Sequence, residues 1–139
     1  MTLLFSTYIL LVSLLCCSAA ATSSWKQTGA GDRQVTVTEQ NSGQIVSVLR
    51  ESTLVVRLKS QLGTGYGWQL MKNDARRLKP LGQPDQESSQ GGLPGGEEYQ
   101  IFRFKALRSG TSLLELHYVR PWEKTARPSK IFRIRVQIR

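Results

Sequence analysis

The chain of 139 residues offers few side chains that could act as a catalytic acid, base or nucleophile. Its one histidine, His117, lies beside Glu115 in an alternating apolar and polar segment, and no G-x-S-x-G motif accompanies it. We therefore interpret His117 as a solvent-facing histidine of a β-strand. The adjacent Glu97 and Glu98 would point to opposite faces of a strand, so they would not share a metal ion. These residues predict neither an enzyme nor a metal or cofactor site.

Three segments rich in glycine, proline and aromatic residues point to binding instead. The first is Gln61–Trp68, with glycine at positions 63, 65 and 67, which would let the backbone take positive φ angles. The second is Gly91–Gly96, which lacks the G-K-[ST] of a phosphate-binding loop. The third is Arg120–Trp122, which contains two residue types that are common among binding hot spots. For Trp122, a place in the core and a place in a contact surface both fit the sequence.

The elements that must position these segments are β-strands. Apolar and polar residues alternate most clearly over 132–138, the pattern of a strand with one face on a core. Shorter runs of the same kind lie at 35–37, 45–49, 53–59, 66–70, 99–106 and 114–118. Turn signals separate these runs, among them a long glycine- and proline-rich connection over 82–96, and no amphipathic helix of three turns can be placed. We predict an all-β fold, an immunoglobulin-like antiparallel β-sandwich of about seven or eight strands.

The N-terminus predicts entry into the secretory pathway. An apolar stretch, Leu3–Leu15, is followed by the small residues of Ser18–Ala21, the order of a cleavable signal peptide, although no lysine or arginine precedes it. An uncleaved signal anchor is the alternative, because about 20 apolar residues can span a bilayer. We expect a signal peptide over 1–21, an N-terminal extension over 22–33 and one domain over 34–139. Both cysteines, Cys16 and Cys17, would leave with the signal peptide, so the mature domain would hold no disulfide.

Together, the three segments resemble the chagasin family of cysteine-peptidase inhibitors. That family carries an N-P-T-T-G-[YF]-x-W, a G-x-G-G and an R-P-[WF] segment on three loops of an immunoglobulin-like fold. The run from Thr64 to Trp68 matches the second half of the first motif, whereas positions 61–63 read Q-L-G in place of N-P-T. Gly95 and Gly96 keep the paired glycines of the second motif, and residues 120–122 match the third in full. The resemblance covers residues 34–139 as one domain.

The resemblance implies a reversible protein inhibitor that wedges three loops into the active-site cleft of a papain-like cysteine peptidase. The Gly63–Gly65 apex would cover the catalytic cysteine, Trp122 would pack across the cleft, and Arg120 would brace its loop or pair with an enzyme carboxylate. The implied contact residues are Gly63, Thr64, Gly65, Tyr66, Leu93, Pro94, Gly95, Gly96, Arg120, Pro121 and Trp122. It implies no cofactor and no metal. We expect a monomer, secreted or held in the lumen of a vesicle or lysosome.

The net charge of +9 leaves a second function open, a secreted basic β-sandwich that binds anionic glycans as an adhesion module. Three arginines, Arg133, Arg135 and Arg139, would line one face of a strand. A basic patch could be extended by Arg103, Lys105 and Arg108. The plain alternative is a solvated strand face. A secreted protein is not expected to bind nucleic acid, and no stable membrane association is expected once the signal peptide is cleaved.

Overall fold

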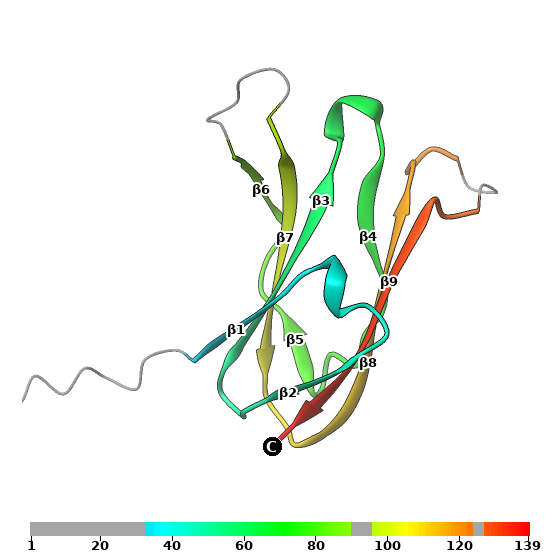
Figure 1. Cartoon of the computed structure of the whole chain (residues 1–139). Coiled ribbons are helices and arrows are strands. Elements are labelled where there is room, and N and C mark those ends of the chain that lie inside the picture. The colour runs from blue at the N-terminus through cyan, green and yellow to red at the C-terminus, as the bar shows by residue number, and fades with distance from the viewer. Residues whose placement is uncertain (1–32, 90–95, 124–126) are drawn as a thin grey trace, which may run out of the picture.

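The computed structural model describes residues 33–89, 96–123 and 127–139, apart from the side chain at position 62. These residues form two β-sheets that lie face to face, and the described part contains no α-helix (Figure 1). One sheet holds β1 (Gln34–Val37), β3 (Thr53–Ser60), β5 (Leu78–Pro80), β6 (Asp85–Ser88) and β7 (Glu98–Ala106). The other holds β2 (Ile45–Val48), β4 (Gly67–Lys72), β8 (Gly110–Val119) and β9 (Lys130–Ile138). The prediction of an all-β, immunoglobulin-like sandwich is confirmed.

The strand order is β1-β3-β7-β5 in the first sheet, with β6 also paired to β7, and β2-β9-β8-β4 in the second. The central pairs are antiparallel, as the sequence predicts, but β1 pairs with β3 and β2 pairs with β9 in parallel. These two edges are parallel because the chain crosses from one sheet to the other after β1, through a 3-10 turn, η1 (Glu39–Asn41), and makes no hairpin there.

The core lies between the sheets and is built from alternate residues of the central strands. The fully buried large side chains include Leu54, Leu58, Phe104, Leu114, Leu116, Phe132 and Ile134. Burial of each such side chain stabilises the folded state by about 1.5–3 kcal/mol relative to an exposed position. The alternating pattern therefore favours a sandwich, in which one face of each strand is buried. The residues between them, such as Arg133 and Arg135 on β9, face solvent.

Two short strands lie where the sequence predicts none. Asp85–Ser88 forms β6 inside the segment predicted to be one long flexible connection over 82–96. Its residues are polar because it is an edge strand without a buried face, and Asp85 and Glu87 form ion pairs with Arg103 and Arg57. The second strand, β5, is only three residues long and contributes the fully buried Leu78 to the core.

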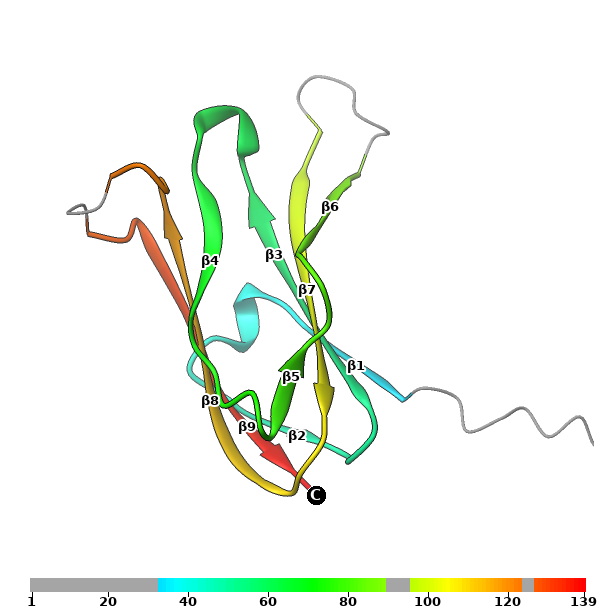
Figure 2. The ribbon, with the colours of Figure 1, turned by 180° about the vertical axis from the view of Figure 1, so that it is seen from behind.

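The fold brings three connections to one end of the sandwich: β3–β4, β6–β7 and β8–β9 (Figures 1 and 2). The β4–β5 and β7–β8 turns and the C-terminus lie at the opposite end. Each predicted binding segment belongs to one of the three connections. The predicted signal peptide, 1–21, lies outside the described residues, and no helix among those described is long and apolar enough to cross a membrane.

Candidate functional site

The β3–β4 connection is a tight turn that the chain stabilises by itself. Residues Leu62–Thr64 form a 3-10 turn, η2, in which the backbone N–H and the hydroxyl of Thr64 both donate to the Gln61 carbonyl, at 3.0 and 2.6 Å. Of the three glycines expected to use positive φ, only Gly65 does, at +77°. Gly63 is exposed at the apex, and a Cβ there would have no atom within 4 Å.

Aromatic rings support this turn from below. The rings of Tyr66 and Tyr118 stack with centroids 5.3 Å apart, and Trp68 lies 5.1 Å from Tyr118. The Tyr118 hydroxyl accepts the Gln61 N–H at 2.9 Å, and the buried Trp68 indole donates to the Lys59 carbonyl at 3.0 Å. Tyr118 on β8 therefore holds a backbone position of the β3–β4 connection.

Gln100 is a site residue that the motifs did not identify. Its buried side chain accepts the Trp68 backbone N–H at 2.6 Å and the Ser60 hydroxyl at 3.4 Å. It therefore ties β7 to β3 and β4 directly below the turn. The signal that could have found it is a polar residue at a core-facing position of the 99–106 run.

The β8–β9 connection carries Arg120, whose guanidinium lies 4.4 Å above the ring centroid of Tyr66. It also pairs with Glu123 at 3.1 Å, and the Glu123 N–H donates to the Arg120 carbonyl at 3.0 Å. The hydrogen bond that Arg120 donates to the Glu123 carboxylate raises the pKa of Arg120. Of the two roles that the resemblance implies for Arg120, the structure shows the bracing of its own loop, because Glu123 already pairs with it.

Trp122 lies on the surface, 65% exposed, so the alternative of a core tryptophan is wrong. One edge of its indole rests on the backbone of Gly65, since a Cβ built there would come within 2.2 Å of the indole Cη2. Only glycine permits this approach. The β3–β4 and β8–β9 connections thus meet and present one continuous surface that contains Gly63, Thr64 and Trp122.

The base of the β6–β7 connection is fixed to the same end of the sandwich. Ser89 and Glu97 exchange two hydrogen bonds, and Glu97 pairs with Lys59 on β3 at 2.6 Å. The hydrogen bond that Lys59 donates to the Glu97 carboxylate lowers the pKa of Glu97 and raises that of Lys59. Gly96 is half-buried at this base, whereas the predicted contact residues Leu93, Pro94 and Gly95 lie outside the described residues.

An open groove of about 360 Å³ is lined by residues of the β3–β4 and β8–β9 connections and of the strand ends that carry them. Its lining includes Gln61, Thr64, Tyr66, Tyr118, Arg120 and Lys130. It combines aromatic faces with positive charge, but among its lining residues no nucleophile stands beside a general base. Across the ranges that the structure describes, no three side chains gather that could hold a metal ion. The arrangement can bind a protein surface.

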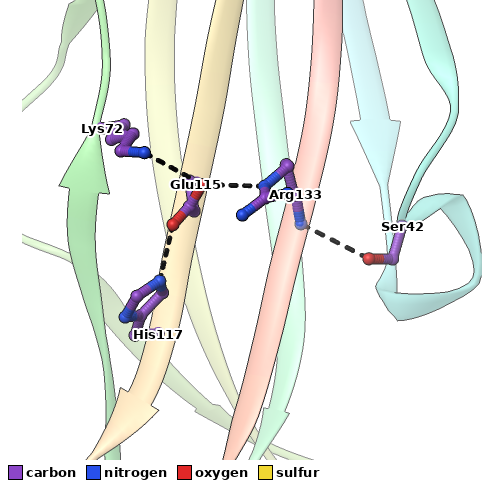
Figure 3. Close-up of polar contacts among 5 residues, drawn as sticks. All are labelled: Ser42, Lys72, Glu115, His117 and Arg133. Carbon is purple, nitrogen blue, oxygen red and sulfur yellow. Dashed lines mark hydrogen bonds and ion pairs between the residues drawn. The ribbon is translucent and has the colours of Figure 1, made fainter. Parts of the chain in front are cut away.

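The basic residues do not form the single patch that the sequence suggested. Arg133 and Arg135 lie on β9, whereas Arg103 and Lys105 lie on β7 in the other sheet. Arg133 pairs with Glu115 at 2.8 Å, and His117 contacts the same carboxylate at 2.7 Å (Figure 3). His117 lies on the outer face of β8, opposite the core residues Leu116 and Tyr118, and its side chain is only 19% exposed because it contacts Glu115.

Known proteins share both the sequence pattern and the fold. Residues 47–136 match the family described as "Chagasin family peptidase inhibitor I42". The chain is 26% identical over 111 residues to Amoebiasin-2 of Entamoeba histolytica, covering 74% of this chain and 84% of that protein. The crystal structure of the cysteine protease inhibitor EhICP2 from Entamoeba histolytica has a TM-score of 0.64 at 22% identity, over 80% of this chain and 100% of that one. The structure of PbICP-C in complex with falcipain-2 has a TM-score of 0.57 at 17% identity, over 77% of this chain and 99% of that one.

Proposed function

The chain belongs to the chagasin family of peptidase inhibitors, and we propose that it blocks papain-like cysteine peptidases by placing its three connections in the active-site cleft. The observation that carries the proposal is the contact between Trp122 and Gly65, which joins the two best-matched motifs in one exposed surface. The complex of PbICP-C with falcipain-2 supports the kind of partner. The protein is therefore an inhibitor and not an enzyme.

The geometry of the apex supports inhibition without cleavage. Gly63 and Thr64 are exposed and would enter the cleft first, over the catalytic cysteine. Their backbone is wound into a 3-10 turn, and Thr64 is bound to the Gln61 carbonyl by two hydrogen bonds. A peptide bond held in a turn is not in the geometry that nucleophilic attack requires, because the reacting atoms must be aligned as well as close.

The bracing of the connections supports tight binding. Gln61 is held by Tyr118, Arg120 lies on Tyr66, and the indole of Trp122 rests on Gly65. Each of these contacts orders a segment before the peptidase arrives. Ordering a flexible interface side chain costs about 0.5–1.5 kcal/mol on binding, so an interface that is already ordered keeps more of its contact energy as affinity.

A titration of papain with the purified protein, followed with a small fluorogenic substrate, tests the proposal. We expect stoichiometric loss of activity that returns on dilution, with the added protein intact by mass spectrometry. Cleavage of the protein in the β3–β4 connection would make it a substrate and overturn the proposed geometry. Failure of the folded protein to inhibit papain and several related peptidases would overturn the proposed target class.

We further propose that the protein enters the secretory pathway and works outside the cell or in a vesicular or lysosomal lumen. The apolar stretch Leu3–Leu15 and the small residues Ser18–Ala21 support this. Amino-terminal sequencing of protein recovered from the medium tests it, and we expect a start close to position 22. A secreted protein that still begins at Met1 would contradict cleavage.

A further inference from the structure

A second polar site lies at the end of the sandwich opposite the three connections, where the β4–β5 turn packs on the β7–β8 turn (Figure 2). The Leu107 N–H donates to the Arg77 carbonyl at 2.7 Å. The side chain of Arg77 lies against the backbone of Gly110, where a Cβ would come within 2.8 Å of Arg77 Nε. Gly110 has a φ of +125°, so both its conformation and this approach favour glycine. Two turns that are distant in sequence thus pack on each other and form one unit.

An open pocket of about 350 Å³ in this unit is lined by Asp74, Arg76, Arg77, Arg108 and Ser109. The Asp74 carboxylate is already engaged on both oxygens, since it accepts the Arg76 backbone N–H at 3.1 Å and pairs with Arg77 Nη1. The hydrogen bond from Arg77 lowers the pKa of Asp74, so the carboxylate is charged at neutral pH. Asp74 therefore compensates the charge of Arg77. Among the described residues, the guanidinium groups of Arg76 and Arg108 form no ion pair, although the charge of Arg76 also lowers the pKa of Asp74.

Arg77, which lines this pocket, has a donor that no described residue accepts. Its Nε is buried and makes no hydrogen bond to any of the residues that the structure describes. Buried donors without an acceptor are rare in folded proteins, and a bound ion is one of the regular explanations. Guanidinium groups bind tetrahedral oxyanions through paired N–H donors, and the Ser109 hydroxyl at the rim adds another donor.

We propose that this pocket binds a sulfate or phosphate group, held by Arg76, Arg77 and Arg108. The pocket belongs to the β4–β5 and β7–β8 turns and Trp122 to the β8–β9 connection, and these elements lie at opposite ends of the sandwich (Figures 1 and 2). The protein can therefore hold the anion and a peptidase together. The proposal does not depend on peptidase inhibition. It also gives the basic character of the chain a defined location, which the separated arginines of β7 and β9 do not provide.

The test is an NMR titration of the ¹⁵N-labelled protein with inorganic sulfate and inorganic phosphate at constant ionic strength. We expect saturable shifts at the Ser109 and Gly110 amides. In the Arg76→Gln/Arg108→Gln double variant, affinity should fall at least about tenfold, because two charge-assisted contacts are lost. The matched control is Arg135→Gln, an exposed arginine of β9 outside the pocket, which should change affinity less than about twofold. Shifts that do not saturate, or an equal loss in the control, would overturn the proposal.

A heparin tetrasaccharide distinguishes the source of the anion. Affinity for it well above that for inorganic sulfate, and lost in the same double variant, would identify a sulfated glycan chain as the ligand. Equal affinities for the tetrasaccharide and for inorganic sulfate would identify the free ion as the ligand. Papain inhibition by the double variant should equal that of the wild-type protein. If the wild-type protein binds sulfate but does not inhibit papain, only the proposed inhibition is overturned. Binding of heparin that survives in the double variant would show that the glycan uses other basic residues and would count against this pocket.

Discussion

Gly65 must satisfy two requirements at once: its φ is positive, and its backbone carries the indole of Trp122. We predict that Gly65→Ala lowers stability by about 1–2 kcal/mol through the left-handed backbone alone. It should also displace Trp122, because the new methyl would lie within 2.2 Å of the ring. The free energy of peptidase binding should therefore fall by more than the free energy of unfolding. Thermal unfolding and inhibition constants measured on the same preparation separate the two effects.

Two glycines of the same chain serve as controls. Gly43 has a φ of +83° and no atom within 4 Å of its Cβ position, so Gly43→Ala should show the backbone cost with normal inhibition. Gly63 has neither a positive φ nor a close neighbour, so Gly63→Ala should fold as the wild type does. If Gly43→Ala weakened inhibition as much as Gly65→Ala, the displacement of Trp122 could not be the cause.

Trp122 itself is predicted to be a binding hot spot. Truncation of an exposed tryptophan removes little core packing, so Trp122→Ala should leave the unfolding transition near that of the wild type. Inhibition should weaken by at least about 2 kcal/mol, roughly 30-fold in the inhibition constant. Leu113→Ala, at a 40% exposed position on β8, is the control and should inhibit normally. An unchanged inhibition constant for Trp122→Ala would remove the indole from the contact surface.

At the level of elements, β8 positions the β3–β4 connection through one hydroxyl. Tyr118→Phe would remove the acceptor of the Gln61 N–H while keeping the stacked rings. We expect a loss of about 1–3 kcal/mol in stability and faster hydrogen exchange at the Gln61 amide. Tyr66→Phe is the matched control, because its ring stacks in the same cluster and its hydroxyl forms no hydrogen bond within the part of the chain that the structure describes. Equal exchange rates in both variants would show that the turn does not depend on Tyr118.

The elements that the sequence predicts well are those with one buried face. Over 132–138 the alternation alone places every core residue, because solvation of the other face forces polar residues between them. The polar edge strand β6 has no such signal, and β5 is too short to show a period. The parallel pairing of β1 with β3 and of β2 with β9 depends on a crossing of the chain between the sheets, which the local sequence does not encode. The surface position of Trp122 depends on Gly65, a residue far from it in the sequence.

At the scale of the molecule, the two ends of the sandwich differ in chemistry. One end combines glycines, aromatic rings and Trp122, and the other concentrates arginines around a pocket. The motifs of the first end could be recognised in the sequence because each lies within one short segment. The pocket of the second could not, since Arg77 and Arg108 come from separate turns, and Arg77 packs against Gly110 of the other turn.

Global stability is predicted to depend on Glu115, whose buried carboxylate joins β4, β8 and β9 through Lys72, His117 and Arg133 (Figure 3). The hydrogen bonds from Arg133 and then His117 lower the pKa of Glu115 below its ordinary value of 4.5. Because the folded-state pKa is lowered, the stabilisation is complete above about pH 4.5 and is lost as the pH falls through the folded-state pKa.

Glu115→Gln should therefore cost about 1–3 kcal/mol at pH 7 and progressively less below pH 4.5, measured by urea unfolding at pH 7, 4.5 and 3. Glu87→Gln, at a 50% exposed carboxylate, should change stability by less than about 1 kcal/mol at each pH. A difference between wild type and Glu115→Gln that stayed constant from pH 7 to 3 would contradict the role of the charged carboxylate, because protonation would then cost the folded state nothing.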